Sequence, residues 1–160
     1  MRLQILCIGR MKSGPETTLL NHYTDRLSKS GRSLGITHVD IVALPESRAA
    51  TVDLRKTDEA KALFEKFDSG GHLIALDEHG KDIDSVQFSN SVQSCLDSGV
   101  STLAIAIGGP DGHGPELLKK ANATVRFGKM TWPHQLVRVL AAEQLYRATT
   151  ILSGHPYHRQ

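Results

Sequence analysis

The feature that most constrains this chain is a repeated alternation of short apolar segments with longer segments of helical spacing. The short segments, rich in Val, Ile, Leu and Ala, predict five β-strands, at residues 3–8, 36–44, 72–76, 101–107 and 123–127. Apolar residues at helical spacing follow Pro15, a cap at Thr57, Pro115 and Pro133, and a further helix before Gly99 carries Phe88, Val92, Cys95 and Leu96 on one face. Strands that alternate with helices predict a parallel α/β sheet flanked by helices. With 160 residues, the chain is one domain, residues 1–160.

The last predicted helix, residues 133–152, is apolar nearly all the way round. Pro133 suits its first turn and Gly154 suits its end. One face carries Leu136, Val137, Leu140, Ala141, Ala148 and Ile151, and the other side carries Val139, Ala142, Leu145 and Tyr146. Because a surface helix needs one apolar stripe, the second side, which includes Leu145, is predicted to pack against another copy of the chain. The helix therefore predicts a homodimer.

Two pairs of polar residues lie one turn apart on this helix. Glu143 and Arg147 share one side and predict a helical ion pair. His134 and Arg138 share the opposite side, where neither residue can neutralise the other. This second pair is therefore a candidate for binding or chemistry.

Composition excludes several classes of protein. A net charge of +2 is too small for a protein that coats nucleic acid, although basic residues concentrate in the last 42 positions. No apolar run is long enough for a membrane span, and the apolar start ends at Gly9, which favours a buried strand over a signal peptide. Cys7 and Cys95 lie far apart in the sequence and form no Cys-x-x-Cys motif, which indicates reduced thiols in the core of a cytoplasmic protein.

Three predicted loops follow the carboxyl ends of strands, where open α/β sheets bind their ligands. They begin at Leu76, Gly108 and Gly128. Their acidic residues, Asp77, Glu78 and Asp111, are typical turn formers and predict no metal site, and His79 and His113 are predicted to face solvent. The glycines do not form the G-x-G-x-x-G pattern of a dinucleotide site, which disfavours a dehydrogenase. From these residues, the chain is an α/β ligand-binding protein.

A longer combination of motifs is more specific. It comprises Ile107-Gly108-Gly109-Pro110-Asp111-Gly112, then Met130-Thr131-Trp132-Pro133-His134-Gln135-Leu136-Val137-Arg138, and the tail His155-Pro156-Tyr157-His158-Arg159. With these motifs the chain closely resembles, over its whole length, the small ribosomal RNA methyltransferase H family of the SPOUT class. The resemblance implies S-adenosyl-L-methionine as cofactor, methylation of N3 of a pseudouridine in large-subunit rRNA, and a carboxyl-terminal trefoil knot. General experience argues against knots, so this expectation rests on the resemblance alone.

The resemblance also assigns residues to the cofactor. The positions that match the cofactor loops of the family are Leu76, Gly108, Phe127, Gly128, Lys129, Met130, Thr131 and Trp132. Glycine lets the main chain approach a ligand closely, while apolar side chains cover the adenine faces. The chain departs from the usual pattern at Trp132, where a smaller apolar residue is expected, and at Asp111, where Glu is frequent.

Methylation at N3 requires loss of an imide proton and stabilisation of a developing uracil anion. In the tail, His158 can accept a proton, Arg159 can stabilise the anion, and Tyr157 can stack or donate a hydrogen bond. The alternative is a solvated chain end, in which case Arg138 becomes the candidate cation. His134, Arg138 and His155 are the predicted RNA-binding residues.

The prediction is therefore a cytoplasmic, homodimeric rRNA methyltransferase. A basic patch this small favours an assembled ribosomal particle over naked rRNA as substrate. The alternative is a non-enzymatic ribosome-associated RNA-binding protein of the same fold. Calorimetry with adenosylmethionine separates the two, because a pure RNA binder should show no heat of cofactor binding.

Overall fold

The structure is a computed structural model that describes residues 1–158. Its elements are β1 (Arg2–Ile8), α1 (Pro15–Ser30), the 3-10 helix η1 (Gly31–Leu34), β2 (His38–Leu44), α2 (Val52–Lys66), β3 (His72–Asp82), α3 (Ser85–Asp97), β4 (Thr102–Ile107), α4 (Pro115–Lys120), β5 (Ala123–Arg126) and α5 (His134–Leu152). The five strands form one parallel sheet in the order β2-β1-β4-β3-β5. This confirms the predicted parallel α/β architecture. Within the described residues, no helix has the length and apolar character needed to span a membrane.

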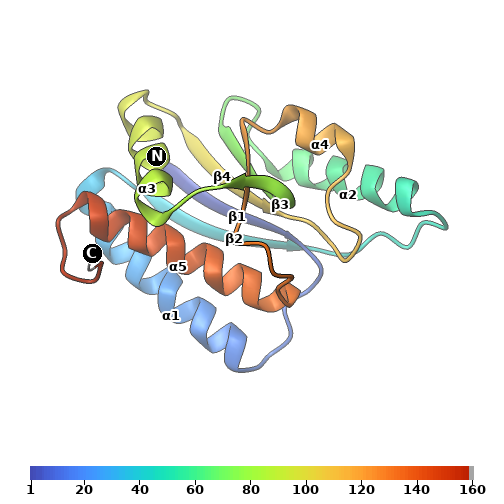
Figure 1. Cartoon of the computed structure of the whole chain (residues 1–160), viewed down its shortest axis with the longest axis horizontal. Coiled ribbons are helices and arrows are strands. Elements are labelled where there is room, and N and C mark those ends of the chain that lie inside the picture. The colour runs from blue at the N-terminus through green and yellow to red at the C-terminus, as the bar shows by residue number, and fades with distance from the viewer. Residues whose placement is uncertain (159–160) are drawn as a thin grey trace.

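Helices cover both faces of the sheet (Figure 1). Helices α1, α3 and α5 pack on one face, over strand residues such as Ile5 and Ile105, and α2 and α4 pack on the other face, over Leu6 and Ala106. The central strand β4 is buried along its whole length, and β1 is buried from Leu3 onward. Strands covered on both faces are apolar at successive positions, which is why these two segments were recognisable from the sequence.

Helix α2 begins earlier than predicted. Its N-cap is Thr51, whose hydroxyl accepts a hydrogen bond from the Leu54 amide at 3.2 Å, and Thr57 lies inside the helix. The prediction of a loop over residues 45–56 was wrong for the first turn. Val52 and Leu54 in that turn are exposed, so no buried apolar stripe marks it in the sequence.

Strand β3 also differs from the prediction, because the expected polar turn after Leu76 is part of the strand. Val125 of β5 pairs with Leu76 and again with Lys81, so the intervening residues bulge around β5. At Gly80 the two backbones nearly touch, since a Cβ there would lie 2.5 Å from the carbonyl carbon of Val125. A glycine is therefore required at this crossing. The trefoil knot implied by the family resemblance stays a prediction.

Helix α5 is buried within its own domain more completely than the sequence pattern indicated. It packs against α1 and α3, and Leu145 is 1% exposed. The assignment of Leu145 to a partner-facing side was therefore wrong: its side belongs to the core of the domain. The apolar surface that α5 leaves accessible lies on the first predicted face, where Leu136 is exposed and Leu140 and Ile151 are half-buried.

Candidate active site

The three predicted ligand loops converge at the carboxyl edge of the sheet. Leu76 at the end of the first part of β3 pairs with Ile107 at the end of β4, which brings Gly108 beside it. A pocket of about 190 Å³ is lined by Leu76, residues 126–132 and Val137. An adjoining cleft of about 570 Å³ is lined by Leu76, residues 107–113, Trp132 and His134. All residues that the resemblance assigns to the cofactor thus line two adjacent cavities. The two cavities share Leu76, Asp77, Glu78, Trp132 and Val137.

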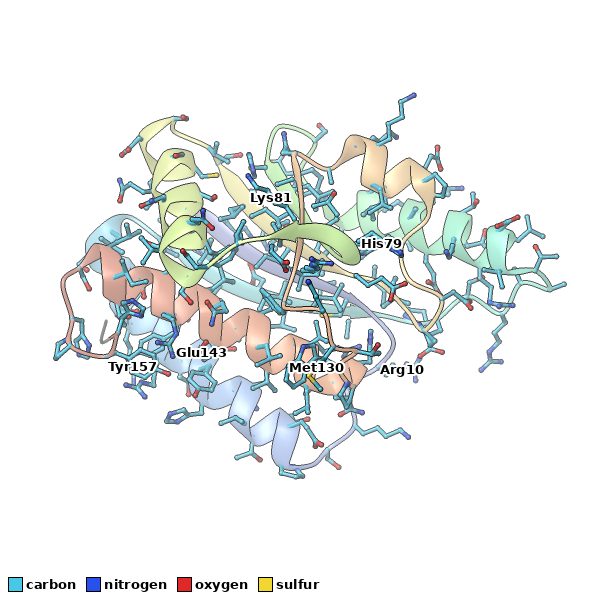
Figure 2. The ribbon with its side chains drawn as sticks, viewed as in Figure 1. Arg10, His79, Lys81, Met130, Glu143 and Tyr157 are labelled. Carbon is cyan, nitrogen blue, oxygen red and sulfur yellow. The ribbon has the colours of Figure 1, made fainter. Side chains whose placement is uncertain are left out.

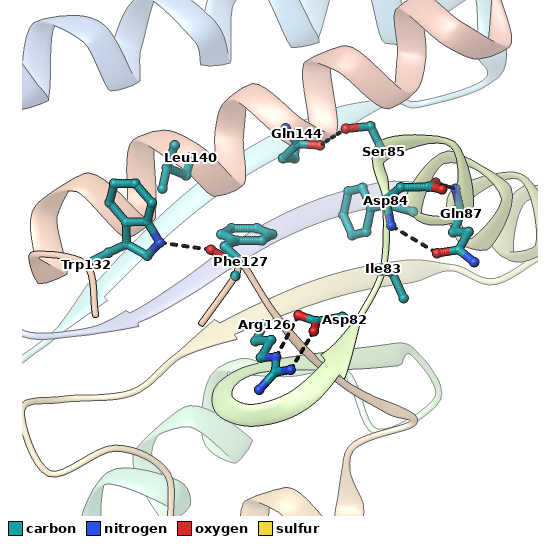
Figure 3. Close-up of a pocket in the computed structure, with 12 residues that line it drawn as sticks. Asp82, Ile83, Asp84, Ser85, Gln87, Arg126, Phe127, Trp132, Leu140 and Gln144 are labelled. Atoms are coloured by element: carbon teal, nitrogen blue, oxygen red, sulfur yellow. Dashed lines mark hydrogen bonds and ion pairs between the residues drawn. The ribbon is translucent and has the colours of Figure 1, made fainter. Parts of the chain in front are cut away.

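Trp132 separates this site from a third cleft. Its indole N–H donates to the carbonyl of Phe127 at 2.9 Å and closes the loop on itself. On the other side of Trp132 a cleft of about 700 Å³ runs between α5 and the start of α3 (Figure 3). Arg126 forms an ion pair with Asp82 across the floor of that cleft, with Nε donating at 2.6 Å. Arg126, Phe127, Gly128 and Trp132 line both this cleft and the smaller pocket, so these four residues form the wall between the two cavities.

The glycine loop after β4 is held by an ion pair that the sequence did not reveal. Arg55 of α2 donates to Asp111 at 2.7 Å, and this hydrogen bond holds the pKa of the Asp111 carboxyl below its ordinary value. Glu59 of the same helix lies against Gly109, where an added Cβ would approach its carboxylate at 2.9 Å, and burial raises the pKa of Glu59. Asp111 is thus a paired residue, although it was predicted as a plain turn former.

The two loop histidines behave differently. His79 has an 85% exposed side chain, as predicted. His113 was predicted to face solvent and is instead 6% exposed, with Nε2 3.2 Å from the carbonyl oxygen of Ala106. Burial lowers its pKa, so the neutral ring with its proton on Nε2 donates to that carbonyl. His113 therefore supports the glycine loop from below, a position that no local pattern signals.

The pair His134 and Arg138 is directed inward. Arg138 has 0% of its surface exposed, and its Nη2 donates to the carbonyl oxygens of Ile8 and Gly9, both at 2.8 Å. His134 is half-buried, with Nε2 2.5 Å from the oxygen of Ile8, and burial lowers its pKa. The prediction that Arg138 contacts RNA or the reacting base was wrong in this structure, because no part of it reaches the surface.

The carboxyl-terminal tail packs on the domain and is not a solvated end up to its last described residue, His158. The Tyr157 hydroxyl donates to Glu143 at 3.1 Å, and the Arg147 guanidinium lies 4.8 Å from the Tyr157 ring centre. Burial, with hydrogen bonding to Tyr23 and the charge of Glu143, raises the pKa of Tyr157. The predicted ion pair between Glu143 and Arg147 is confirmed.

This packing separates the tail from the pocket of the same chain. Glu143 lies nine residues along α5 from His134, which corresponds to about 14 Å along the helix axis. Figure 2 shows Tyr157 beside Glu143, and Met130 of the cofactor loop nearer the start of α5. His158 lies 3.4 Å from Arg147, and His155 is exposed. Arg159, the predicted anion-stabilising cation, lies outside the described residues.

The chain matches a family model described as a predicted SPOUT methyltransferase over residues 1–158. It belongs to the SPOUT methyltransferase family. Among similar proteins, those of Brucella anthropi, Rhizobium johnstonii and Methylocella silvestris are 49%, 52% and 50% identical over 159 residues, with 99% of each chain covered. All three are named Ribosomal RNA large subunit methyltransferase H.

A solved structure also resembles the fold. The probable methylase family protein from Haemophilus influenzae Rd KW20 matches with a TM-score of 0.52 at 13% identity, over 99% of this chain and 70% of that chain. At this identity the likeness concerns the fold alone. Among residues 1–158 no group of three or more His, Cys, Asp or Glu side chains is arranged to hold a metal ion.

Proposed function

We propose that this SPOUT protein is an S-adenosylmethionine-dependent methyltransferase that modifies N3 of a pseudouridine in large-subunit rRNA. The observation that carries the proposal is the convergence of Leu76, Gly108 and residues 127–132 on one site. Full-length identity of about 50% to proteins named Ribosomal RNA large subunit methyltransferase H supports the same substrate. The compartment that follows from an rRNA substrate is the cytoplasm.

The residues present fit an adenosyl group. Leu76, Met130 and Val137 offer apolar surface to an adenine ring. Gly108 and Gly128 have no side chain, so the backbone of their loops can approach the ligand closely. At Gly108 a Cβ would lie 3.0 Å from the carbonyl carbon of Gly112 and 3.1 Å from the amide nitrogen of His113, so the loop is closed tightly around it. When bound, adenosylmethionine supplies an electrophilic methyl group.

The tail residues are proposed to act on the uracil ring. His158 accepts the imide proton, Arg159 stabilises the anion, and Tyr157 anchors the segment through its hydrogen bond to Glu143. Because Tyr157 is held about 14 Å along α5 from the start of that helix, we propose that the tail serves the pocket of a second copy. Each pocket is then completed by two chains.

The second copy is proposed to cover the apolar surface left on α1 and α5. Leu136 is 36% exposed and Leu19 of α1 is 43% exposed. The helices run side by side on one face of the sheet (Figure 1), so the two leucines belong to the same layer. A homodimer through this layer replaces the interface through Leu145, which is filled by the core of the domain itself.

The substrate is proposed to be an assembled ribosomal particle. A net charge of +2 gives little general attraction for naked RNA, so shape and local contacts must supply the affinity. A non-enzymatic RNA-binding protein of the same fold is the alternative, and it predicts no heat when adenosylmethionine is added in a calorimeter.

The decisive experiment deletes residues 157–160 and compares two measurements. Adenosylmethionine affinity by calorimetry should stay within a few-fold, whereas single-turnover methylation of purified large-subunit particles should be lost. The variant His158→Ala should slow transfer, and the loss should shrink as pH rises because the substrate imide then ionises without a base. Arg159→Ala should show no such recovery, because an arginine cation acts at any pH. Transfer at the normal rate by the truncated protein would disprove the role of the tail.

A further inference from the structure

A buried arginine fixes the loop that follows β1. Arg138 reaches from α5 under this loop, and its Nη2 donates to two successive carbonyls, those of Ile8 and Gly9. Nη1 lies 3.7 Å from the sulfur of Met11, three residues beyond Ile8. His134 adds a contact to Ile8. Four contacts from one turn of α5 therefore hold residues 8–11 in place.

The charge of Arg138 has no direct counterion. No carboxylate oxygen of residues 1–158 lies within 4 Å of its guanidinium nitrogens, and its buried Nε has no hydrogen-bond partner among those residues. The carboxylate of Glu46 also lies beside Gly9, but a buried cation that no acid contacts directly is costly to a fold. An arginine that bonds backbone carbonyls at such a cost indicates that the position of this loop matters.

The anchored loop exposes positive charge. Gly9 has a φ of +90°, which turns the chain sharply after β1, and Arg10 and Lys12 beyond it are both exposed. The Lys12 carbonyl accepts from the Thr17 hydroxyl at 2.5 Å, so the far end of the loop is tied to α1. Arg10 and Lys12 thus lie on a loop, residues 9–12, whose two ends are both held by hydrogen bonds.

The loop lies at the edge of the sheet where the candidate active site opens. Cys7 pairs with Ile107, so the residues after β1 are neighbours of Gly108 and its loop. His134, which contacts Ile8, also lines the cleft that includes Gly108. Figure 2 shows Arg10 at the end of α5 nearest Met130 of the cofactor loop.

We infer that residues 9–12 bind the phosphate backbone of the RNA beside the modified base, and that Arg138 is the positioning residue for this contact. This inference rests on the proposed function and names part of its RNA interface. A fixed loop with two exposed cations beside the pocket suits contacts to phosphates, which carry affinity and not sequence preference. With a total charge of only +2, a local contact of this kind would supply much of the electrostatic attraction.

The test compares two double variants that remove the same charge. Arg10→Ala with Lys12→Ala removes the loop cations, and Lys29→Ala with Arg32→Ala removes two exposed cations near the opposite edge of the sheet, before β2. Methylation of purified large-subunit particles is measured over a range of salt concentrations, and adenosylmethionine affinity is measured by calorimetry.

Loss of two phosphate contacts should reduce the slope of log(kcat/KM) against log salt by about 1.6. If the variant and the unaltered protein have equal kcat/KM at about 1 M salt, this difference in slope corresponds to a roughly 20-fold lower kcat/KM of the variant at about 0.15 M salt. We expect this loss as a higher KM. The Lys29 and Arg32 variant should keep its slope, and both variants should keep their cofactor affinity.

Equal slopes for the two double variants would overturn the inference, and so would weaker cofactor binding by the Arg10 and Lys12 variant, which would assign these cations to the cofactor. Absence of methylation by the unaltered protein would instead refute the proposed function.

The positioning role of Arg138 has its own test. Arg138→Lys keeps the charge but replaces a planar guanidinium, which contacts two carbonyls through Nη2 and Met11 through Nη1, with a single ammonium on a shorter stem. We expect a raised KM for particles and a reduced salt slope with unchanged cofactor affinity. A lower kcat at unchanged KM would show a role in the chemical step and contradict the positioning role. If Arg138→Lys does not fold, the loop variants still decide whether residues 9–12 bind phosphate.

Discussion

Replacement of Gly80 by alanine should destabilise the protein strongly, because two backbone segments cross there. The new Cβ would lie 2.5 Å from the carbonyl carbon of Val125, and 2.7 Å from its nitrogen and oxygen. Carbon atoms pack at about 3.5 Å or more, so the segments would have to separate by roughly 1 Å. Neither segment can move freely, since Val125 is paired with both Leu76 and Lys81.

The magnitude follows from overpacking and from the strained ladder. Overpacking costs about 1–3 kcal/mol, and each weakened backbone hydrogen bond adds about 1 kcal/mol, so we expect a loss of about 3 kcal/mol. With a urea m-value of about 2 kcal/mol/M, the unfolding midpoint should fall by about 1.5 M. Measurements at one fixed protein concentration keep any dimer contribution constant.

Gly70→Ala is the matched control. The nearest atom to its added Cβ is 3.8 Å away, and Gly70 has no positive φ. Its stability should stay within about 0.5 kcal/mol of the unaltered protein. Equal midpoints for the Gly80 and Gly70 variants would refute the argument that the two backbones cross in contact.

Three further predictions concern the site and the interface. Gly108→Val should weaken adenosylmethionine binding at least about tenfold, since a branched side chain must displace the loop at Gly112; an unchanged calorimetric affinity would place the pocket elsewhere. Leu136→Glu should give a folded monomer of 17.5 kDa by light scattering, whereas Leu145→Glu should fail to fold, and a dimeric Leu136→Glu protein would exclude the proposed interface. His113 has a lowered pKa in the folded state, so the unfolded chain binds more protons below about pH 6.5, and stability should fall as pH drops through that value. His113→Gln should flatten this dependence measured by urea unfolding between about pH 7 and 5, and an equally steep curve would contradict the assignment.

Local signals predicted most of the fold. Pro15, Pro115 and the glycines that follow helices mark element ends by backbone geometry, which acts within a few residues. The errors arose where a distant segment decides the structure. Residues 77–80 resemble a turn, but they form a bulge inside β3, because the flanking residues Leu76 and Lys81 both pair with Val125 of β5. Thr51 and Thr57 are both good caps, and the exposed first turn of α2 gave no reason to choose between them.

The candidate site divides in the same way. Leu76, Gly108 and residues 127–132 belong to motifs near strand ends, so the sequence could place them together. Arg138 was misassigned because charge suggests exposure, and only the three-dimensional contact with Ile8 and Gly9 shows why a cation is buried there. Arg55 was missed because its partner, Asp111, is 56 residues away.

Helix α5 joins the loop of residues 127–132 at one end to the tail at the other, and it fixes the distance between the two. Its 19 residues span about 28 Å. Insertion of a single residue between Glu143 and the end of α5 would advance the tail by about 1.5 Å and rotate it by about 100° around the helix axis, relative to Glu143. Tyr157 would then lose Glu143, although every side chain would still be present. Insertions and deletions among relatives should therefore accumulate in connections such as residues 45–51. They should be excluded from α5, because its length sets the distance between residues 127–132 and the tail.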